Sequence, residues 1–209
     1  GSEIFLLECV KRWQKALELP LYTPSLNRQL LKEFGITDRV RIISLQSKRR
    51  GKYAFFFNTV ILPRIWEQKI LSHDLYFLYL FPTHFIRRRP SVWFAAEPLR
   101  ILYDLRHHDH YKDKEISFHF YPELQYNRLR VSELDVLLHL IEQLDSAPTF
   151  DRLATNSRAN GSYLQTVYGR RPDRIVYPGV NLPASASPPP PSEQILFVGR
   201  LLKHKRVDL

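Results

Sequence analysis

Short apolar runs alternate with amphipathic stretches along the chain, and this alternation predicts its secondary structure. Apolar side chains recur at helical spacing over residues 2–17, so the chain is expected to open in a helix. Short continuous apolar runs are typical of strands that are covered on both faces. Such runs predict strands at residues 19–23, 40–45, 75–81, 92–95, 152–155 and 174–177.

Helical patterns occupy most of the intervals between these strands. They predict helices at residues 25–34, 53–71, 121–144 and 158–168. Ser25 and Ser157 are candidate N-caps, because a serine hydroxyl accepts a hydrogen bond from a free backbone N–H group of the first turn. Pro63 is expected to interrupt or kink the second of these helices. The alternation predicts the α/β class, with a mostly parallel sheet that has helices on both faces.

A run rich in proline and small residues, NLPASASPPPPSE, covers residues 181–193. Its composition is typical of a stiff, exposed connector. It divides the chain into a first domain of residues 1–180, a linker of residues 181–193 and the beginning of a second domain at residues 194–209.

The 209 residues include 31 Lys and Arg against 21 Asp and Glu, a formal net charge of +10. This excess implies an acidic partner: nucleic acid, an anionic membrane surface or a phosphorylated small molecule. No nucleic-acid recognition motif is present, so nucleic acid is not the expected partner. No apolar run is long enough to span a bilayer, and Cys9, the single cysteine, leaves no internal disulfide. We predict a cytoplasmic protein, with peripheral attachment at the inner membrane face as the alternative.

The end of the chain combines a strand, a glycine and a cluster of cations. Residues 195–198 are a short apolar run, and Gly199 permits a sharp turn after it. The cations that follow are Arg200, Lys203, Lys205 and Arg206. Cations beside a helix N-terminus at the carboxyl end of a strand suit a phosphate or diphosphate. The alternative interpretation is a solvated basic loop.

Four stretches carry a resemblance to a known family. They are GSE at residues 1–3, SVWFAAEPLRILYDL at 91–105, RLATNSRANGSYLQTVYGRRPDRIVYPGVNL at 152–182 and ILFVGRLLKHKRVDL at 195–209. The first is similar to a Gly-Gly-x-Glu turn, and the second, more loosely, to a His-Glu-Pro-x-Arg stretch. The third is similar to a segment that begins with an Asn-Ser turn and ends with Tyr-Pro-x-Val-Asp. The fourth is similar to the Val-Gly-Arg-Leu sequence with which a second domain begins. These are motifs of the family-4 retaining glycosyltransferases, which the chain resembles.

The resemblance implies a Rossmann-like, doubly wound parallel sheet, the N-terminal half of a GT-B fold, truncated at both ends. It implies transfer of a sugar, mannosyl or glucosyl, from a nucleotide-diphosphate sugar to a hydroxyl of a glycan, lipid or small molecule, with retention. By the same matching, Arg200 and Lys205 stabilise the leaving diphosphate, and Gly1 lies in the turn that approaches the donor. The family's chemistry needs no metal or cofactor, and the nucleotide sugar is a substrate.

The chain departs from the family pattern at several positions. Ala96 stands where the His of the His-Glu-Pro stretch is expected, although Glu97 and Pro98 remain. His204 and Arg206 flank Lys205 in place of Glu and Gly. The paired glutamates that bind the donor would follow residue 209. We therefore expect the full-length parent to be an enzyme and residues 1–209 alone to be inactive.

Two residues are candidate catalytic groups in the first domain. Glu97 is the carboxylate that remains from the family motif. His84, in the sequence FPTHF, follows a predicted strand and so is expected at a sheet edge where ligands bind. His84 would serve the acceptor and partly replace the absent family histidine. The alternative interpretation is a structural histidine.

A basic and aromatic stretch, SKRRGKYAFFF, covers residues 47–57. Its cations, Lys48, Arg49, Arg50 and Lys52, are candidates for binding an anionic membrane. The favoured alternative is a basic loop before a helix whose aromatic side chains are buried. Residues 87–89, three consecutive arginines, either extend this patch or form a solvated turn.

Residues 107–119 contain four histidines and an aspartate close together, a composition compatible with zinc. Adjacent ligands in a charged loop rarely close a tetrahedral site, so we expect no metal there and favour an acceptor-side loop. The leading functional prediction is a glycosyltransferase. The alternative is a non-catalytic module, derived from such an enzyme, that docks on a membrane or a protein partner.

Overall fold

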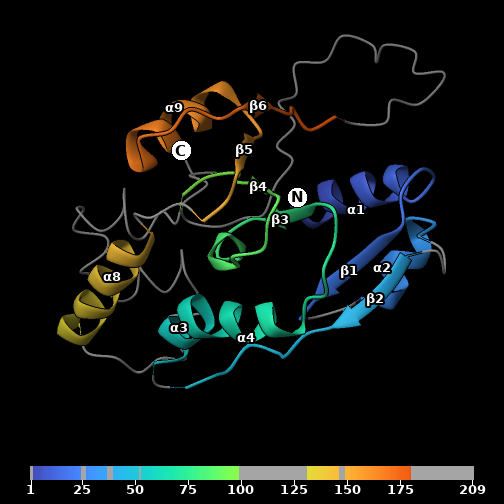
Figure 1. The fold of residues 1–209 in the computed structure, drawn as a ribbon. Helices are drawn as coiled ribbons and strands as arrows, with labels where there is room; N and C mark the ends of the chain where they lie inside the picture. Colours follow the sequence, from blue (N-terminus) through green and yellow to red (C-terminus); the bar gives the residue numbers. More distant parts are fainter. Residues whose placement is uncertain are drawn as a thin grey trace, which may run out of the picture.

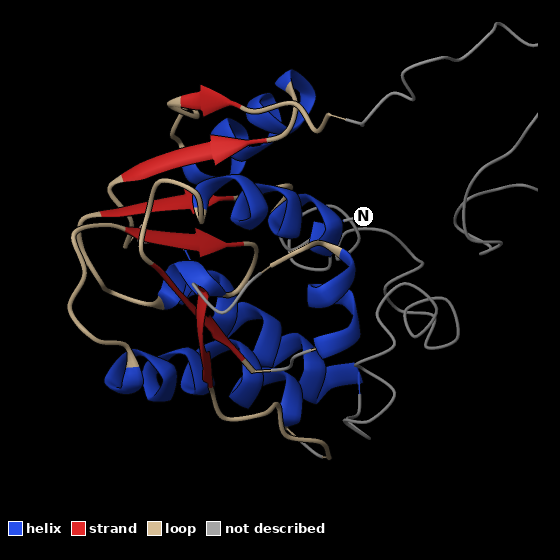
Figure 2. Ribbon diagram, turned by 90° about the vertical axis from the view of Figure 1, so that its right-hand side faces the viewer, coloured by secondary structure: helices blue, strands red, loops and turns tan. Residues whose placement is uncertain are grey.

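The computed structural model describes residues 2–24, 27–36, 40–51, 53–98, 131–145 and 149–179 (Figure 1). Strands β1 (Leu19–Thr23) and β2 (Val40–Ser44) form one sheet. A second sheet has the order β3 (Tyr76–Tyr79), β4 (Ser91–Phe94), β5 (Arg152–Thr155) and β6 (Arg174–Ile175). All these pairings are parallel, which confirms the predicted α/β class. The described strands nevertheless lie in two sheets where the sequence predicts one (Figure 2).

Helices connect most of the strands. They are α1 (Ser2–Trp13), α2 (Arg28–Glu33), α3 (Ala54–Phe56), the π-helix η1 (Phe57–Ile61), α4 (Leu62–Lys69), the 3₁₀-helix η2 (Thr83–Phe85), α8 (Val131–Asp145) and α9 (Arg158–Tyr168). The interruption predicted near Pro63 takes the form of η1, which separates α3 from α4. Pro63 lies in the first turn of α4, and because Ile61 before it keeps helical φ and ψ, the helical path continues from η1 into α4 through the proline.

The N-caps show how far local sequence determines the helix ends. Ser157 is the N-cap of α9, since its hydroxyl accepts a hydrogen bond of 3.1 Å from the Asn160 N–H group, as predicted. The cap of α2 is Asn27 rather than Ser25, and its side chain accepts a hydrogen bond of 3.1 Å from Leu30. Helix α2 therefore begins later than the sequence predicts, because Asn is as good an N-cap as Ser.

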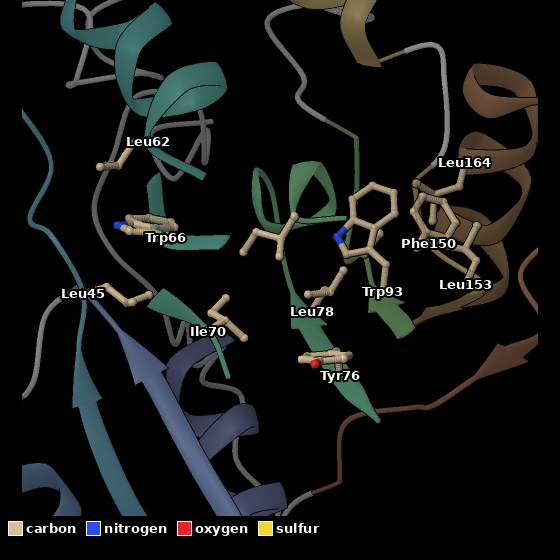
Figure 3. Packing of buried hydrophobic residues seen from close by; sticks show 12 residues of the cluster. Leu45, Leu62, Trp66, Ile70, Tyr76, Leu78, Trp93, Phe150, Leu153 and Leu164 are labelled. Carbon is tan, nitrogen blue, oxygen red and sulfur yellow. The ribbon is translucent and has the colours of Figure 1, made fainter. Parts of the chain in front are cut away.

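The larger sheet is covered by helices on both faces. Register places Leu78, Trp93 and Leu153 side by side on one face, where they share a buried cluster with side chains of α4 and α9 (Figure 3). On the opposite face, Phe5 of α1 stacks on Phe94 of β4 with ring centroids 4.8 Å apart. Since strands alternate their side chains between faces, two different sets of apolar residues are buried. This arrangement leaves the carboxyl ends of the strands as the edge on which polar residues gather.

Asp173 joins the last two strands from the loop before β6. Its carboxylate accepts hydrogen bonds of 2.8 Å from the Leu153 N–H group and 2.8 Å from the Arg152 side chain, and one of 3.2 Å from Arg170. The backbone hydrogen bond from Leu153, followed by the two arginines, lowers the pKa of Asp173 below its ordinary value of 3.8. The ionised form is therefore the one that stabilises this corner of the sheet.

Replacing Asp173 by asparagine is expected to lower the free energy of unfolding by about 1 kcal/mol at neutral pH, because two charge-assisted hydrogen bonds weaken. The loss is no larger because solvent screens the attraction between the carboxylate and the arginines. Because the folded-state pKa is depressed, this contribution is present above pH 3.8 and is lost as pH falls through the lower folded-state value. Urea unfolding at neutral and acidic pH measures both effects. Asp74→Asn, at an exposed loop position, is the control. Equal losses in the two variants would contradict the assigned role of Asp173.

Candidate functional site

Polar residues gather at the carboxyl edge of the larger sheet. Strand β4 leads through Ala95 and Ala96 to Glu97, which is exposed, and the neighbouring strand β5 leads to Asn156 and Ser157. Because β4 and β5 are parallel and adjacent, the residues after them emerge at the same edge. Open α/β sheets bind their ligands at this edge. The structure therefore places Glu97 at the carboxyl edge of the larger sheet, near the turn that follows β5.

The first turn of α1 reaches the same edge. Phe5 contacts Tyr79 and Phe94, the last residues of β3 and β4, with ring centroids 6.3 and 4.8 Å apart. Burial, and then the negative charges of Cys9 and Glu3, raise the pKa of Tyr79 to about 12. Its phenol is consequently neutral under physiological conditions and can both donate and accept hydrogen bonds. Tyr79 thus adds a half-buried neutral hydroxyl group at the end of β3.

The turn after β5 is held by its own side chains. The Asn156 side-chain oxygen accepts a hydrogen bond of 2.6 Å from the Asn160 amide, while Ser157 caps α9. Both groups therefore have a structural role, the default interpretation of the sequence. The Thr155 hydroxyl is fully buried at the end of β5 and finds no hydrogen-bond partner among the described residues. Such an orphaned polar group is uncommon and is a feature of this edge that the sequence did not reveal.

His84 lies in η2, after the carboxyl end of β3, and its side chain is buried. Its side chain is only 1% exposed, packs against Trp93 with ring centroids 4.2 Å apart, and contacts the Asp145 carboxylate through Nε2. The Tyr168 hydroxyl donates a hydrogen bond of 2.7 Å to the other oxygen of Asp145. We call His84, Asp145 and Tyr168 the buried polar triad. Its enclosure favours the structural interpretation of His84 over direct contact with an acceptor.

Sequence reasoning missed Asp145 and Tyr168. One signal was available for Asp145, which is the last residue of α8. A negative charge at a helix C-terminus is opposed by the helix dipole, so a carboxylate there needs a partner that compensates for it. His84 and Tyr168 supply that compensation from two other segments of the chain.

The basic stretch before α3 has exposed cations, and its aromatic side chains range from the buried Phe55 to the exposed Tyr53. Lys48, Arg49 and Arg50 are exposed. Arg49 exchanges backbone hydrogen bonds of 2.8 and 2.9 Å with the side chain of Asn58, and its guanidinium lies 3.9 Å from the ring centroid of Phe57. The first phenylalanine of the helix, Phe55, is buried. This geometry favours the basic loop before a buried helix face over aromatic insertion into a membrane.

Several predicted residues lie outside the described ranges. They are Gly1, Lys52, the histidines of residues 107–119, Arg200 and Lys205. Within the described ranges, no three His, Cys, Asp or Glu side chains are grouped so as to hold a metal ion. None of the helices in these ranges combines the length and apolar character needed to cross a bilayer.

The described residues form an α/β fold with parallel strands in two sheets. Comparison of the chain with protein-family models, curated proteins and solved structures finds no match.

Proposed function

We propose that the chain is the Rossmann-like, acceptor-side domain of a retaining family-4 glycosyltransferase, together with the start of its nucleotide-sugar-binding domain. The observation that carries this proposal is the position of Glu97 after β4, at the carboxyl edge of a parallel sheet and beside the first turn of α1. Two stretches that resemble the family, residues 91–105 and 152–182, begin with β4 and β5, and their described parts include Glu97 and Asn156 at this edge. Both the sequence resemblance and the topology thus point to the carboxyl edge of the larger sheet.

Each residue has a chemical role in the proposed reaction. Arg200 and Lys205 stabilise the negative charge that develops on the leaving nucleoside diphosphate. Glu97 accepts a hydrogen bond from a sugar hydroxyl, and the neutral Tyr79 phenol supports the same region. The substrates are a nucleotide-diphosphate sugar and a glycan, lipid or small-molecule acceptor. The proposed location is the cytoplasm or the inner face of an anionic membrane, toward which the exposed Lys48 and Arg50 would be attracted.

In a protein that carries the complete second domain, Arg200→Ala and Lys205→Ala are each expected to lower the rate of nucleoside-diphosphate release at least about tenfold, roughly 1.4 kcal/mol of transition-state stabilisation. The loss should fall mainly on kcat, because charge on the diphosphate grows as the glycosidic bond breaks. Release is measured with a coupled assay at saturating donor. Lys203→Ala removes a cation from the same loop and serves as the control.

A second variant separates the acceptor side from the donor side. Glu97→Gln keeps the size of the side chain and should raise KM for the acceptor or lower kcat while leaving donor affinity unchanged. Unchanged turnover in all of these variants would remove the roles assigned to Arg200, Lys205 and Glu97. Absence of acceptor-dependent nucleoside-diphosphate release in the wild type would remove the transferase proposal. If the Arg200 and Lys205 substitutions slow donor hydrolysis but the Glu97 substitution does not, only the role of Glu97 would be removed.

A further inference from the structure

A pocket of about 350 Å³ lies between α4 and the segment that leads into β4. It is lined by Arg64, Glu67, Gln68, Arg87 and Arg88. The lining thus contains three arginines and one carboxylate, which leaves it with an excess of two positive charges. An excess of this size in a concave site attracts small anions more strongly than isolated surface charges do.

The single carboxylate of the pocket is already engaged. Glu67 Oε2 accepts hydrogen bonds of 3.1 Å from Arg64 Nη1 and 3.1 Å from the Arg87 backbone N–H group. Its backbone carbonyl accepts a third, of 2.8 Å, from Arg88 Nη2. Glu67 therefore holds the side chains of Arg64 and Arg88 and the backbone of Arg87, and its one negative charge cannot neutralise three arginines.

Two of the arginines have donors that no described residue uses. The Nε–H group of Arg88 is buried and has no hydrogen-bond partner among the described residues. The guanidinium of Arg87, which is exposed, forms no ion pair with the part of the chain that the structure describes. Buried donors are nearly always satisfied, so an unpaired one in a pocket wall indicates an acceptor that comes from outside the protein.

We propose that this pocket binds a phosphate monoester group. A phosphate monoester carries a charge of about −2 at neutral pH, which matches the charge excess of the wall. Its oxygens can accept several hydrogen bonds from the exposed Arg87 guanidinium, the multidentate recognition for which arginine is suited, while Arg88 adds positive charge to the pocket wall. The pocket volume is close to the lower end of the range for small-molecule sites, roughly 300 Å³, so the group that fits is small.

The pocket is separate from the site of the proposed transferase reaction. Helix α4 leads toward the start of β3, and residues 87–88 come shortly before the start of β4. The pocket is therefore on the side of the amino ends of these strands, whereas Glu97 follows the carboxyl end of β4. The inference does not depend on the proposed function. The phosphate belongs either to a soluble metabolite or to a lipid headgroup, and the experiment distinguishes these two sources.

The test compares Arg87→Gln with Arg41→Gln. Arg41 is an exposed arginine of β2 and does not line the pocket, so both variants lose one charge but only one loses a pocket donor. Binding of inorganic phosphate is measured by calorimetry at low ionic strength. Arg87→Gln is expected to raise Kd at least about tenfold, equivalent to roughly 1.4 kcal/mol, while Arg41→Gln leaves Kd close to that of the wild type. Arg87 is preferred to Arg88 because the latter also holds the end of α4.

A second arm uses phosphatidylcholine vesicles that contain phosphatidic acid, with phosphatidylserine vesicles as the control for charge alone. Binding of free phosphate without preference for phosphatidic acid supports the site and assigns it to a soluble ligand. Preference for phosphatidic acid that is lost in Arg87→Gln supports the site and assigns it to a lipid. Absence of binding in both arms, or equal weakening by the two variants, overturns the proposal.

Discussion

Replacing Trp93 by alanine is expected to lower the free energy of unfolding by about 3–5 kcal/mol, a large part of the total stability of an ordinary domain. Trp93 is fully buried in the middle of the larger sheet. Its ring lies 4.2 Å from that of His84, 4.9 Å from Phe150 and 5.5 Å from Tyr168, centroid to centroid. Truncation would open a cavity between three segments and leave the Leu80 carbonyl without the indole donor that is 3.2 Å from it.

The measurement is urea unfolding followed by far-UV circular dichroism. Trp93→Phe keeps an aromatic ring and should cost clearly less than Trp93→Ala, which provides a result even if the alanine variant does not fold. Tyr177→Ala, where the side chain is 59% exposed, should change stability by no more than about 0.5 kcal/mol. Similar midpoints for the Trp93 and Tyr177 alanine variants would show that the core has been assigned wrongly.

Asp145→Ala is expected to cost a similar amount, about 3–5 kcal/mol, for a different physical reason. Asp145 is fully buried and accepts hydrogen bonds from both other members of the buried polar triad. Its removal leaves His84 Nε2 and the Tyr168 hydroxyl enclosed without an acceptor. The cost comes mainly from these unsatisfied groups, since a buried donor that has lost its partner has also lost water.

A double-mutant cycle separates this explanation from simple loss of packing. His84→Leu combined with Asp145→Leu removes both partners, so it should cost less than the sum of the two single variants. Asp135→Ala, at an exposed position of the same helix, controls for helix propensity and is expected to be within about 0.5 kcal/mol of the wild type. If the two leucine substitutions are additive, His84 and Asp145 do not act as a pair.

Local signals predicted those elements whose boundaries are marked in the sequence. The bounds of β5 and α9 are as predicted because an apolar run ends at Asn156, Ser157 caps the helix and Gly169 ends it with a positive φ of 65°. The division into two sheets could not be predicted in this way. Alternation of strands and helices indicates parallel pairing, but it does not say which of two distant strands will be neighbours.

The candidate site was predictable where it follows from topology. Glu97 lies at the carboxyl edge because any residue just after a parallel strand must do so. His84 also follows a strand, yet the 3₁₀ turn at Thr83–Phe85 directs its side chain into the interior. The pocket around Glu67 depends on side chains from two segments 20 residues apart in sequence, a proximity that no local pattern contains.

The buried polar triad has a consequence for the order in which the chain folds. The contacts of His84 with Asp145 and with the Thr149 hydroxyl join residues separated by 61 and 65 positions, and Ser91 bonds Asp151 across 60. Contacts of such long range form slowly, because a large loop must close before they stabilise the protein. During synthesis, β3 and β4 emerge from the ribosome well before their partners in α8, β5 and α9. Until those partners arrive, Trp93 lacks the covering of Phe150 and Tyr168, so the nascent first half of the chain is expected to expose apolar surface.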